Sequence, residues 1–176
     1  MFLLKSNDNL LLNSIIDVLN QKFTIFNTNE ATNSFATLSI SSNESTFCIK
    51  TDNYKKNIFK PLSSTKLFEE IDSILIKINI NFNDLSYSPV KQNIFYEKKS
   101  LVLGNIHNLI FSALLLHIKS GISKDSLYEM VWPQDKNYQI NKLDTHLTNL
   151  KNLINQKLGY HFNFKTIEGK IFLISN

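Results

Sequence analysis

Residues 121–132 read GISKDSLYEMVW, residues 141–158 read NKLDTHLTNLKNLINQKL, and residues 166–172 read TIEGKIF. Five large apolar side chains recur in the second segment at intervals of four, three, four and four residues: Leu143, Leu147, Leu150, Ile154 and Leu158. This period predicts a long α-helix, from Asn141 to Leu158, that packs one side on a core. The third segment resembles a hairpin. The predicted order is helix, turn, helix, wing.

The other side of this predicted helix is polar and almost free of carboxylates. It carries Lys142, Thr145, Asn149, Asn152 and Gln156. Their amide, hydroxyl and ammonium groups could meet base edges in a major groove. A solvated surface helix more often mixes Glu with Lys, so this face favours nucleic-acid recognition. The alternative to nucleic-acid recognition is an ordinary solvent-exposed face in a protein that is rich in Asn.

The basic charge is concentrated in the second half of the chain. The 176 residues are enough for two small domains, and 43% are hydrophobic, which is typical of a folded core. Residues 1–80 hold eight lysines and eight acidic residues, whereas residues 81–176 hold eleven lysines and seven acidic residues. This excess favours a polyanionic partner, nucleic acid before membrane. Because no Arg occurs, base readout is left to Lys, Asn, Gln and Thr.

Features that the sequence lacks narrow the functional class. Cys48 is the single cysteine, so one chain has no disulfide framework and no cysteine-based metal site. The apolar start ends at Ser6, too early for a signal peptide, and the apolar segment 101–118 is interrupted by polar residues, unlike a membrane span. We therefore expect a cytoplasmic protein. No nucleophile elbow, phosphate loop or paired-carboxylate motif is present, and His146 has no ligand spacing with the other histidines. We expect no catalytic residue, cofactor or metal.

The N-terminal half has the pattern of a small α/β unit. Its apolar periods predict helices at 8–20 and 63–78. Four strands are predicted, Phe2–Lys5, Phe23–Asn27, Ala36–Ile40 and Thr46–Lys50, with a short helical or irregular link at 28–35. A parallel crossover needs a dozen or more residues, and only residues 41–45 separate the last two strands. These two pair as a hairpin or one of them is not a strand, so we do not expect a regularly doubly wound sheet.

The middle of the chain predicts a domain boundary. Residues 79–93 show no sustained period and contain Pro89, which favours a linker at 81–90. Two alternating runs follow at 94–97 and 100–103, and they predict a short β platform ahead of a helix at 105–119.

An ordered set of motifs runs through the C-terminal half. Residues 120–127 read SGISKDSL and are followed by Val131-Trp132, residues 143–151 read LDTHLTNLK, and residues 166–169 read TIEG ahead of Phe172. They resemble OmpR/PhoB-type response regulators, whose winged-helix effector domain has a Val-Trp pair, then Val-Asp-Val-His-Ile with Leu-Arg, then Thr-Val-Arg-Gly with Tyr. The resemblance covers residues from about 87 to 175.

The N-terminal half resembles the receiver domain of the same family, because Lys60-Pro61 follows a hydrophobic strand and precedes a helix. Working receivers hold Mg²⁺ with two acidic residues after the first strand and accept phosphate on an Asp after the third. Here Ser6 and Asn7 stand at the acidic pair, with Asp8 adjacent, and no Asp follows the strand 36–40. Mg²⁺ requires carboxylate oxygens. We therefore expect a pseudo-receiver without a phosphoacceptor, in which Lys60 is structural.

The resemblance implies an α/β pseudo-receiver with a small, irregular doubly wound sheet at residues 1–80. A linker at 81–90 and an α+β winged helix-turn-helix domain at 91–176 would follow. The implied function is a transcription regulator, independent of phosphorylation, that binds duplex DNA as a dimer through the helix 141–158 and the wing 162–175. We expect no membrane partner. The alternative is a non-catalytic adaptor that binds a protein partner and has kept the fold after losing phosphorylation and strong DNA binding.

The resemblance also implies which residues meet DNA: Lys142, Thr145, His146, Thr148, Asn149, Lys151, Asn152, Lys165, Thr166 and Lys170. Lys142 and Lys151 are expected to contact phosphates. The wing departs from the family pattern because Glu168 stands where relatives place a minor-groove Arg, and phosphates repel a carboxylate.

The predicted homodimer uses the N-terminal half, through the surface that includes the helix Ser64 to Ile78. Ile76 and Lys77 interrupt the inward stripe of this helix. Under two-fold symmetry its acidic residues 69, 70 and 72 could pair with Lys66 and Lys77 of a second copy.

Overall fold

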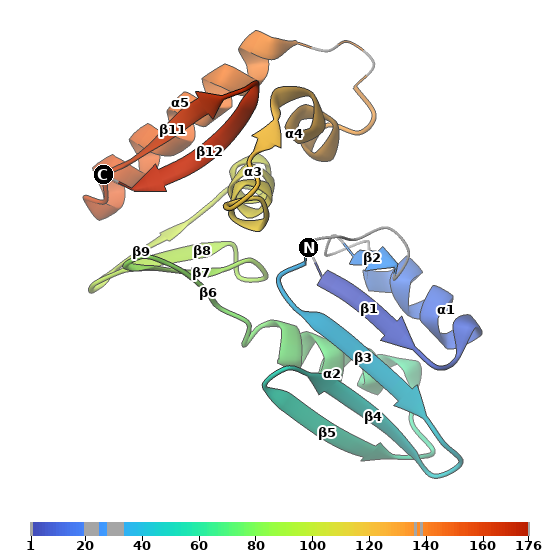
Figure 1. Cartoon of the computed structure of the whole chain (residues 1–176). Helices are drawn as coiled ribbons and strands as arrows, with labels where there is room; N and C mark the ends of the chain where they lie inside the picture. Colours follow the sequence, from blue (N-terminus) through green and yellow to red (C-terminus); the bar gives the residue numbers. More distant parts are fainter. Residues whose placement is uncertain (1, 20–24, 28–33, 136, 138, 176) are drawn as a thin grey trace. The chain divides into compact units, whose positions relative to one another are not determined.

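The computed structural model describes residues 2–19, 25–27, 34–135, 137 and 139–175 (Figure 1). The chain divides into two units, Met1–Ile78 and Asn79–Asn176. The first unit contains the predicted α/β pattern, and the second contains the predicted helices and wing. Each unit is described by itself. The predicted link at 28–35 and the predicted start of the second strand at Phe23 lie largely outside the described residues.

Five strands and two helices form the first unit: β1 (Phe2–Ser6), α1 (Asn9–Leu19), β2 (Ile25–Asn27), β3 (Thr37–Ser42), β4 (Thr46–Thr51), β5 (Tyr54–Phe59) and α2 (Ser64–Leu75). The sheet has the order β2-β1-β3-β4-β5. β1 runs parallel to β2 and β3, whereas β4 is antiparallel to both β3 and β5. The predicted hairpin of β3 and β4 is therefore confirmed.

The sheet differs from a doubly wound one in its second half. Only β2, β1 and β3 are parallel, so the sheet is not regularly doubly wound, as the short connection between β3 and β4 predicted. The reason is loop length, because the connections 43–45 and 52–53 are too short for a crossover helix. β5 was predicted only in part, since its lysine-rich first half has little apolar alternation.

Side-chain caps begin both helices of this unit. The Asp8 carboxylate accepts hydrogen bonds from the backbone N–H groups of Leu10 and Leu11, at 3.0 and 3.1 Å. The Ser63 hydroxyl accepts one from the N–H of Lys66 at 3.3 Å. Such caps satisfy N–H groups that have no partner inside the helix. The sequence predicted both start positions, because Asp and Ser immediately precede apolar periodic runs.

The second unit begins with a four-stranded antiparallel sheet, β6 (Ile80–Phe82), β7 (Leu85–Ser88), β8 (Asn93–Tyr96) and β9 (Lys99–Val102). The predicted linker 81–90 is thus wrong, since it contains most of the first hairpin. Its strands are too short for a sustained period, and the turn between them uses Asn83 at a φ of 48°, a conformation that Asn tolerates. Leu85 and Tyr87 lie on the same side of β7, and both are buried. β8 and β9 confirm the predicted platform.

The remaining elements follow the predicted order. They are α3 (Asn105–Leu116), β10 (Ile122–Ser123), α4 (Lys124–Val131), α5 (Ile140–Leu158), β11 (Phe162–Ile167) and β12 (Lys170–Ser175). β12 pairs antiparallel with both β10 and β11. The hairpin turn consists of Glu168 and Gly169, whose φ values of 49° and 76° suit a two-residue turn between twisted strands. Helix, turn, helix and wing are all present (Figure 1).

One glycine is required between α3 and α4. Gly121 has a φ of 65°, which side-chain-bearing residues rarely adopt. A Cβ atom there would lie 2.5 Å from the Phe172 ring of β12. The close approach lets β10 join β12 and so attaches the start of α4 to the wing sheet.

A buried polar contact joins α3 to the four-stranded sheet. The Tyr87 hydroxyl of β7 donates a hydrogen bond to the Asn108 side-chain oxygen at 2.6 Å and also contacts the Ser112 hydroxyl. Burial raises the pKa of Tyr87, because the phenolate form would lose its hydration. A buried donor without a partner costs about 1–3 kcal/mol, so this pairing specifies how α3 lies on the sheet.

The leucine stripe of α5 forms the centre of the second unit. Its five predicted core residues are all buried: Leu143, Leu147, Leu150, Ile154 and Leu158. The helix packs against α3, α4, β9 and β11. It ends at Gly159, which adopts a φ of 77°, as is common one residue after a helix. No helix within the described ranges has the length and apolar character needed to cross a membrane.

We predict that Leu150→Ala destabilises the second unit by about 2–5 kcal/mol, because Leu150 is completely buried and the smaller side chain leaves a cavity. Trp132 is the single tryptophan and lies in this unit, so its fluorescence during urea unfolding measures the loss. Gln156→Ala, on the exposed side of the same helix, is the control. Equal stability of the two variants would show that the stripe does not support the unit.

Candidate nucleic-acid interface

The exposed side of α5 consists mainly of uncharged polar side chains. Its exposed residues include Asn141, Thr145, Thr148, Asn149, Asn152 and Gln156. At 3.6 residues per turn these positions lie within an arc of about 100°. Of the five residues predicted for this face, four are exposed and Lys142 is half-buried. The face is therefore a strip of amides and hydroxyls.

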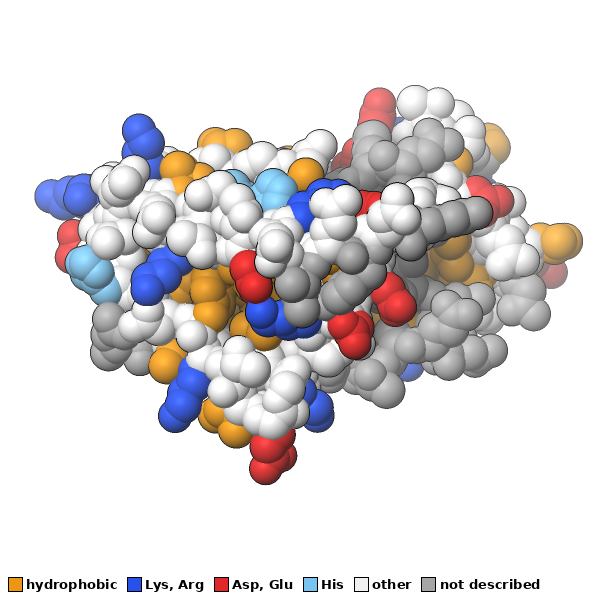
Figure 2. All heavy atoms as spheres, turned by 90° about the horizontal axis from the view of Figure 1, so that it is seen from above, with side chains coloured by type: hydrophobic (Ala, Val, Ile, Leu, Met, Phe, Trp, Pro, Cys, Tyr) orange, Lys and Arg blue, Asp and Glu red, His pale blue; other side chains and the backbone are white. Residues whose placement is uncertain are grey.

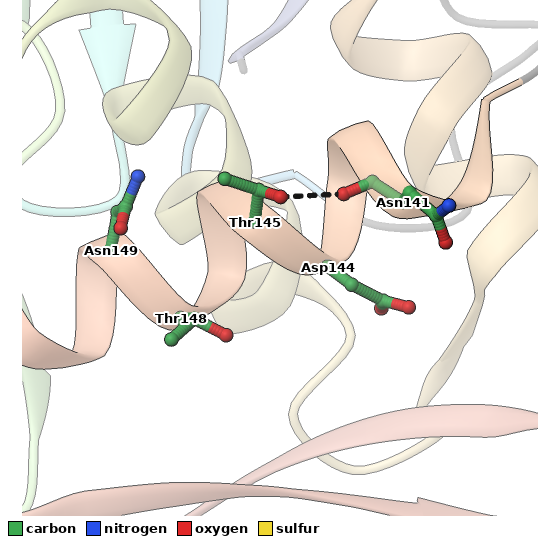
Figure 3. Close-up of a pocket in the computed structure, with 5 residues that line it drawn as sticks. All are labelled: Asn141, Asp144, Thr145, Thr148 and Asn149. Carbon is green, nitrogen blue, oxygen red and sulfur yellow. Dashed lines mark hydrogen bonds between the residues drawn. The ribbon is translucent and has the colours of Figure 1, made fainter.

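An open hollow of about 410 Å³ lies along the first half of this face. It is lined by Asn141, Asp144, Thr145, Thr148 and Asn149 (Figure 3). The Thr145 hydroxyl donates a hydrogen bond to the Asn141 carbonyl at 2.7 Å. The donor of Thr145 is therefore engaged, and its methyl group and the acceptor side of its oxygen are left for contact with a ligand.

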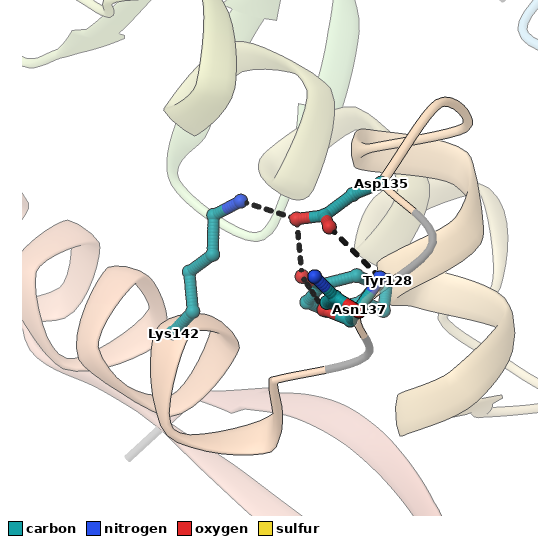
Figure 4. Close-up of polar contacts among 4 residues, drawn as sticks. All are labelled: Tyr128, Asp135, Asn137 and Lys142. Carbon is teal, nitrogen blue, oxygen red and sulfur yellow. Dashed lines mark hydrogen bonds and ion pairs between the residues drawn. The ribbon is translucent and has the colours of Figure 1, made fainter.

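Lys142 belongs to a network around Asp135 (Figure 4). Its ammonium group donates to Asp135 Oδ2 at 2.9 Å, and the Tyr128 hydroxyl donates to the same oxygen at 2.7 Å. The Asn137 N–H donates to Asp135 Oδ1 at 3.1 Å. The ammonium group also lies 4.4 Å from the centre of the Trp132 ring, a cation–π contact. Lys142 thus connects the start of α5 to the turn that follows α4.

These donors change the acidity of Asp135. The hydrogen bond from Lys142 contributes most, those from Tyr128 and the Asn137 backbone follow, and together they lower the pKa of Asp135 to about 2. All three favour the ionised carboxylate. The network therefore holds its charge pair throughout the physiological pH range.

Two other lysines beside α5 also have partners within the unit. Lys124, the first residue of α4, donates to both oxygens of Asp144, at 2.6 and 2.9 Å. Lys151 donates to the side-chain oxygen of Asn163 on β11. Lys142 therefore attaches α5 to the loop after α4. Lys124 attaches it to the start of α4, and Lys151 attaches it to the wing sheet. The sequence showed the positions of these lysines but not these partners.

His146 occupies a flank of α5 between the leucine stripe and the exposed strip. It is half-buried. Its ring centre lies 5.4 Å from that of Trp132 and 5.5 Å from that of His107 on α3. Burial, and then the charge of His146, lower the pKa of His107. The contact with His107 was missed because residues far apart in the sequence give no spacing signal. A helical wheel does place His146 beside Leu143 and Leu150, which indicates its partial burial.

The wing carries exposed lysines near its tip. Lys165, Thr166 and Lys170 are all exposed, as is Glu168 in the turn. Glu168 and Gly169 form the tip itself, so the carboxylate stands between the two lysines. Figure 2 shows lysines and acidic side chains interspersed among uncharged ones, without a continuous cationic patch among the coloured side chains of that face.

The carboxyl ends of β1 and β3 in the first unit are joined by hydrogen bonds. The Asn7 side chain bonds both backbone groups of Ser42, at 3.2 and 3.3 Å. Lys60 donates to the Ser42 hydroxyl at 2.8 Å and to the Asn43 carbonyl. Asp8 caps α1. Asn7 and Lys60 are therefore both bonded to Ser42, and Asp8 is bonded within its own helix. Within the described part of the chain, no three His, Cys, Asp or Glu residues gather in a way that could hold a metal.

The chain is similar to solved structures of response-regulator domains and of the protein RitR. The C-terminal domain of the nisin resistance regulator NsrR, a lantibiotic response regulator, shares 26% identity over 54% of this chain and 93% of its own, with a TM-score of 0.43. The DNA-binding domain of CpxR from E. coli shares 20% identity over 55% and 94%, with a TM-score of 0.45. A mutant of RitR shares 12% identity over 99% and 97%, with a TM-score of 0.46.

Sequence comparison adds no family. No protein-family model matches the chain, and no curated protein matches it either. The TM-scores of the solved structures are low.

We predict that Lys142→Gln raises the pKa of Asp135 from about 2 toward its ordinary value of 3.8, because the amide removes the charged donor. NMR titration of the Asp135 carboxyl carbon measures the shift. Because the folded pKa is depressed, the carboxylate stabilises the fold above about pH 3.8, and this contribution is lost as the pH falls through about 2. Lys157→Gln at the far end of α5 is the control. An unchanged Asp135 titration in the Lys142 variant would contradict the network.

Proposed function

We propose that this chain is a DNA-binding transcription regulator of response-regulator type that works without phosphorylation. It binds duplex DNA as a dimer through α5 (helix 141–158 of the sequence) and the wing 162–175. The observation that carries the proposal is the exposed uncharged strip of α5, held outward by a fully buried leucine stripe. In helix-turn-helix proteins the second helix of the pair enters the major groove, and α5 follows α4 in that position.

The predicted contact residues take different roles in this proposal. Base edges are met by the exposed side chains Thr145, Thr148, Asn149 and Asn152. Phosphates are met by Lys165, Thr166 and Lys170 of the wing, which are exposed. The remaining three, Lys142, His146 and Lys151, are half-buried and mainly position the helix. Since an ammonium group has three donors, both lysines can still reach a phosphate while keeping their internal partners.

A protein-interaction adaptor is the second candidate function. It is favoured by the charge distribution, because three lysines around α5 are engaged inside the unit and Glu168 occupies the wing tip. A mixed surface attracts a polyanion less than a continuous cationic one. The two candidates differ in one measurable property, which is affinity for duplex DNA at low salt.

We predict that the full chain binds duplex DNA with an affinity that falls steeply with salt. Each lysine–phosphate contact adds roughly 0.9 to the slope of log K against log salt. Lys165→Ala with Lys170→Ala should therefore lower the slope by roughly 2 and weaken binding to all sequences similarly. Fluorescence anisotropy with a labelled duplex at several salt concentrations measures both effects.

The matched control for this pair is Lys50→Ala with Lys55→Ala. These two exposed lysines face each other on β4 and β5 of the first unit, and their removal changes the net charge by the same amount. A similar loss of slope in the control would show a general charge effect in place of a wing contact. No binding at the lowest salt would favour the adaptor.

The dimer in this proposal uses the first unit. Ile76, at the end of α2, is 40% exposed and is the apolar centre of the proposed contact. The ion pairs expected across the two-fold axis do not include Glu70, because Glu70 is already paired with Lys56 in its own chain. Lys77 lies over the Tyr54 ring at 5.0 Å. The apolar contact of Ile76 therefore contributes more than cross-pairing.

Independence from phosphorylation is supported by the contacts at the receiver-like end of the sheet. Lys60 is bonded to Ser42 and Asn43, and Asp8 serves as a helix cap. Mg²⁺ binding needs several oxygen ligands, usually with carboxylates. Asp8 is the one carboxylate among residues 6–8, where receivers have a pair. The dimer is consequently proposed to be constitutive.

We predict that Ile76→Glu converts a dimer to a monomer, because a carboxylate cannot be buried at an apolar contact without a partner. Analytical ultracentrifugation of the full chain at micromolar concentration measures this. Leu10→Glu makes the same type of change on α1, where Leu10 is 82% exposed, and should leave the dimer intact. Acetyl phosphate with Mg²⁺ should change neither the mass nor the sedimentation. A monomeric wild-type chain would contradict the dimer, and added phosphate on any residue up to 80 would contradict the pseudo-receiver.

A further inference from the structure

The groups exposed on α5 select among base pairs. An amide such as that of Asn can donate to N6 and accept at N7 of adenine with two parallel hydrogen bonds, and a Thr methyl group fits the methyl group of thymine. Guanine is read in the major groove by the cationic side chains Arg and Lys, and cytosine by a carboxylate that accepts from N4. The exposed strip from Asn141 to Asn152 consists of three Asn and two Thr. Its chemistry matches adenine and thymine.

The groups that would read guanine are directed to other partners. The chain has no Arg. Two lysines beside the hollow have partners within the unit. Lys142 contacts Asp135 and the Trp132 ring, and Lys124 donates to both oxygens of Asp144. Lys151, further along α5, is bonded to Asn163. Each of these lysines therefore has fewer donors left for a guanine O6 and N7.

The group that would read cytosine is also engaged. Asp144 is the one carboxylate among the residues that line the hollow. Both of its oxygens accept hydrogen bonds from Lys124. This leaves the amides of Asn141 and Asn149 and the methyl and hydroxyl groups of Thr145 and Thr148 as the groups offered to a ligand (Figure 3).

We infer that α5 reads a short run of A·T base pairs in the major groove, with Asn149 as the main adenine contact and Thr145 and Thr148 against thymine methyl groups. The inference rests on the proposed function and names the DNA that this site selects. The strip from Asn141 to Asn152 extends about 16 Å along the helix at 1.5 Å per residue. That length covers about five base pairs at 3.4 Å each.

Asn149 is the best-placed reader for a geometric reason. It lies next to Thr148 and one turn after Thr145, at the rim of the hollow. Thr145 has its hydroxyl donor engaged by the Asn141 carbonyl, so it presents a methyl group. Thr145 and Asn149 thus offer a methyl group and an amide one turn apart on the same side of α5, whereas Thr148 lies at the other edge of the exposed strip. A methyl group matches thymine and an amide matches adenine.

Selection from a pool of random duplexes by the full chain tests the inference. We expect three to five consecutive A·T pairs in the retained duplexes and a preference of about tenfold over a G·C-substituted duplex at constant salt. Asn149→Ala should remove most of that preference, so that the A·T and G·C-substituted duplexes bind with similar affinity. Asn13→Ala, an exposed Asn on α1, should have no effect.

A second duplex distinguishes the major groove from the minor groove. Inosine·cytosine pairs keep an A·T-like minor groove but present the O6 and N7 acceptors of guanine in the major groove. We expect the protein to bind an inosine-substituted site as weakly as a G·C site. Equal binding to A·T and inosine sites would place the readout in the minor groove and overturn the inference. Duplex binding without base preference would overturn the inference and leave the proposed function standing, whereas no duplex binding at low salt would overturn both.

Discussion

Burial of the leucine stripe of α5 determines what the rest of the second unit can do. Leu143, Leu150 and Ile154 are completely buried, and α3, α4, β9 and β11 pack around the helix. A helix fixed on one side by large side chains cannot rotate, because any rotation would expose apolar surface at roughly 25 cal/mol per Å². The opposite side is therefore presented in a single orientation. Whatever α5 binds meets a preorganised strip of amides and hydroxyls.

Polar contacts then fix the position of that helix along its length. Lys142 ties its first turn to Asp135, Lys124 ties Asp144 to α4, and Lys151 ties its middle to β11. Each of these lysines is engaged by a partner within the unit, so its charge contributes less to the positive potential at the surface. Partly exposed ion pairs contribute little to stability individually. Their effect is on geometry, since together they attach α5 to three different elements.

The sequence predicted those parts of the fold that depend on local period and turn chemistry. The stripe of α5, the hairpin of β3 and β4, and the wing with its Glu168-Gly169 turn were all found. It failed for β6 and β7, because Pro89 and the many Asn and Ser residues around them indicated a linker. It also failed for the partners of Lys142 and His146. Those partners are set by how α3 and α4 approach α5, which a single sequence does not reveal.

In the proposed function, lysines position α5 and amides contact the bases. This division of roles has a consequence for affinity. Phosphate contacts supply most of the sequence-independent attraction to DNA, and in the proposed function they are assigned mainly to the exposed wing lysines Lys165 and Lys170, with Glu168 opposing them. Amide and hydroxyl contacts discriminate between bases but add little long-range attraction. A single copy would therefore discriminate well between base sequences but would bind DNA with low affinity. The proposed dimer, in which two copies join through the first unit, would make the second binding event intramolecular and so raise the overall affinity without any further charge.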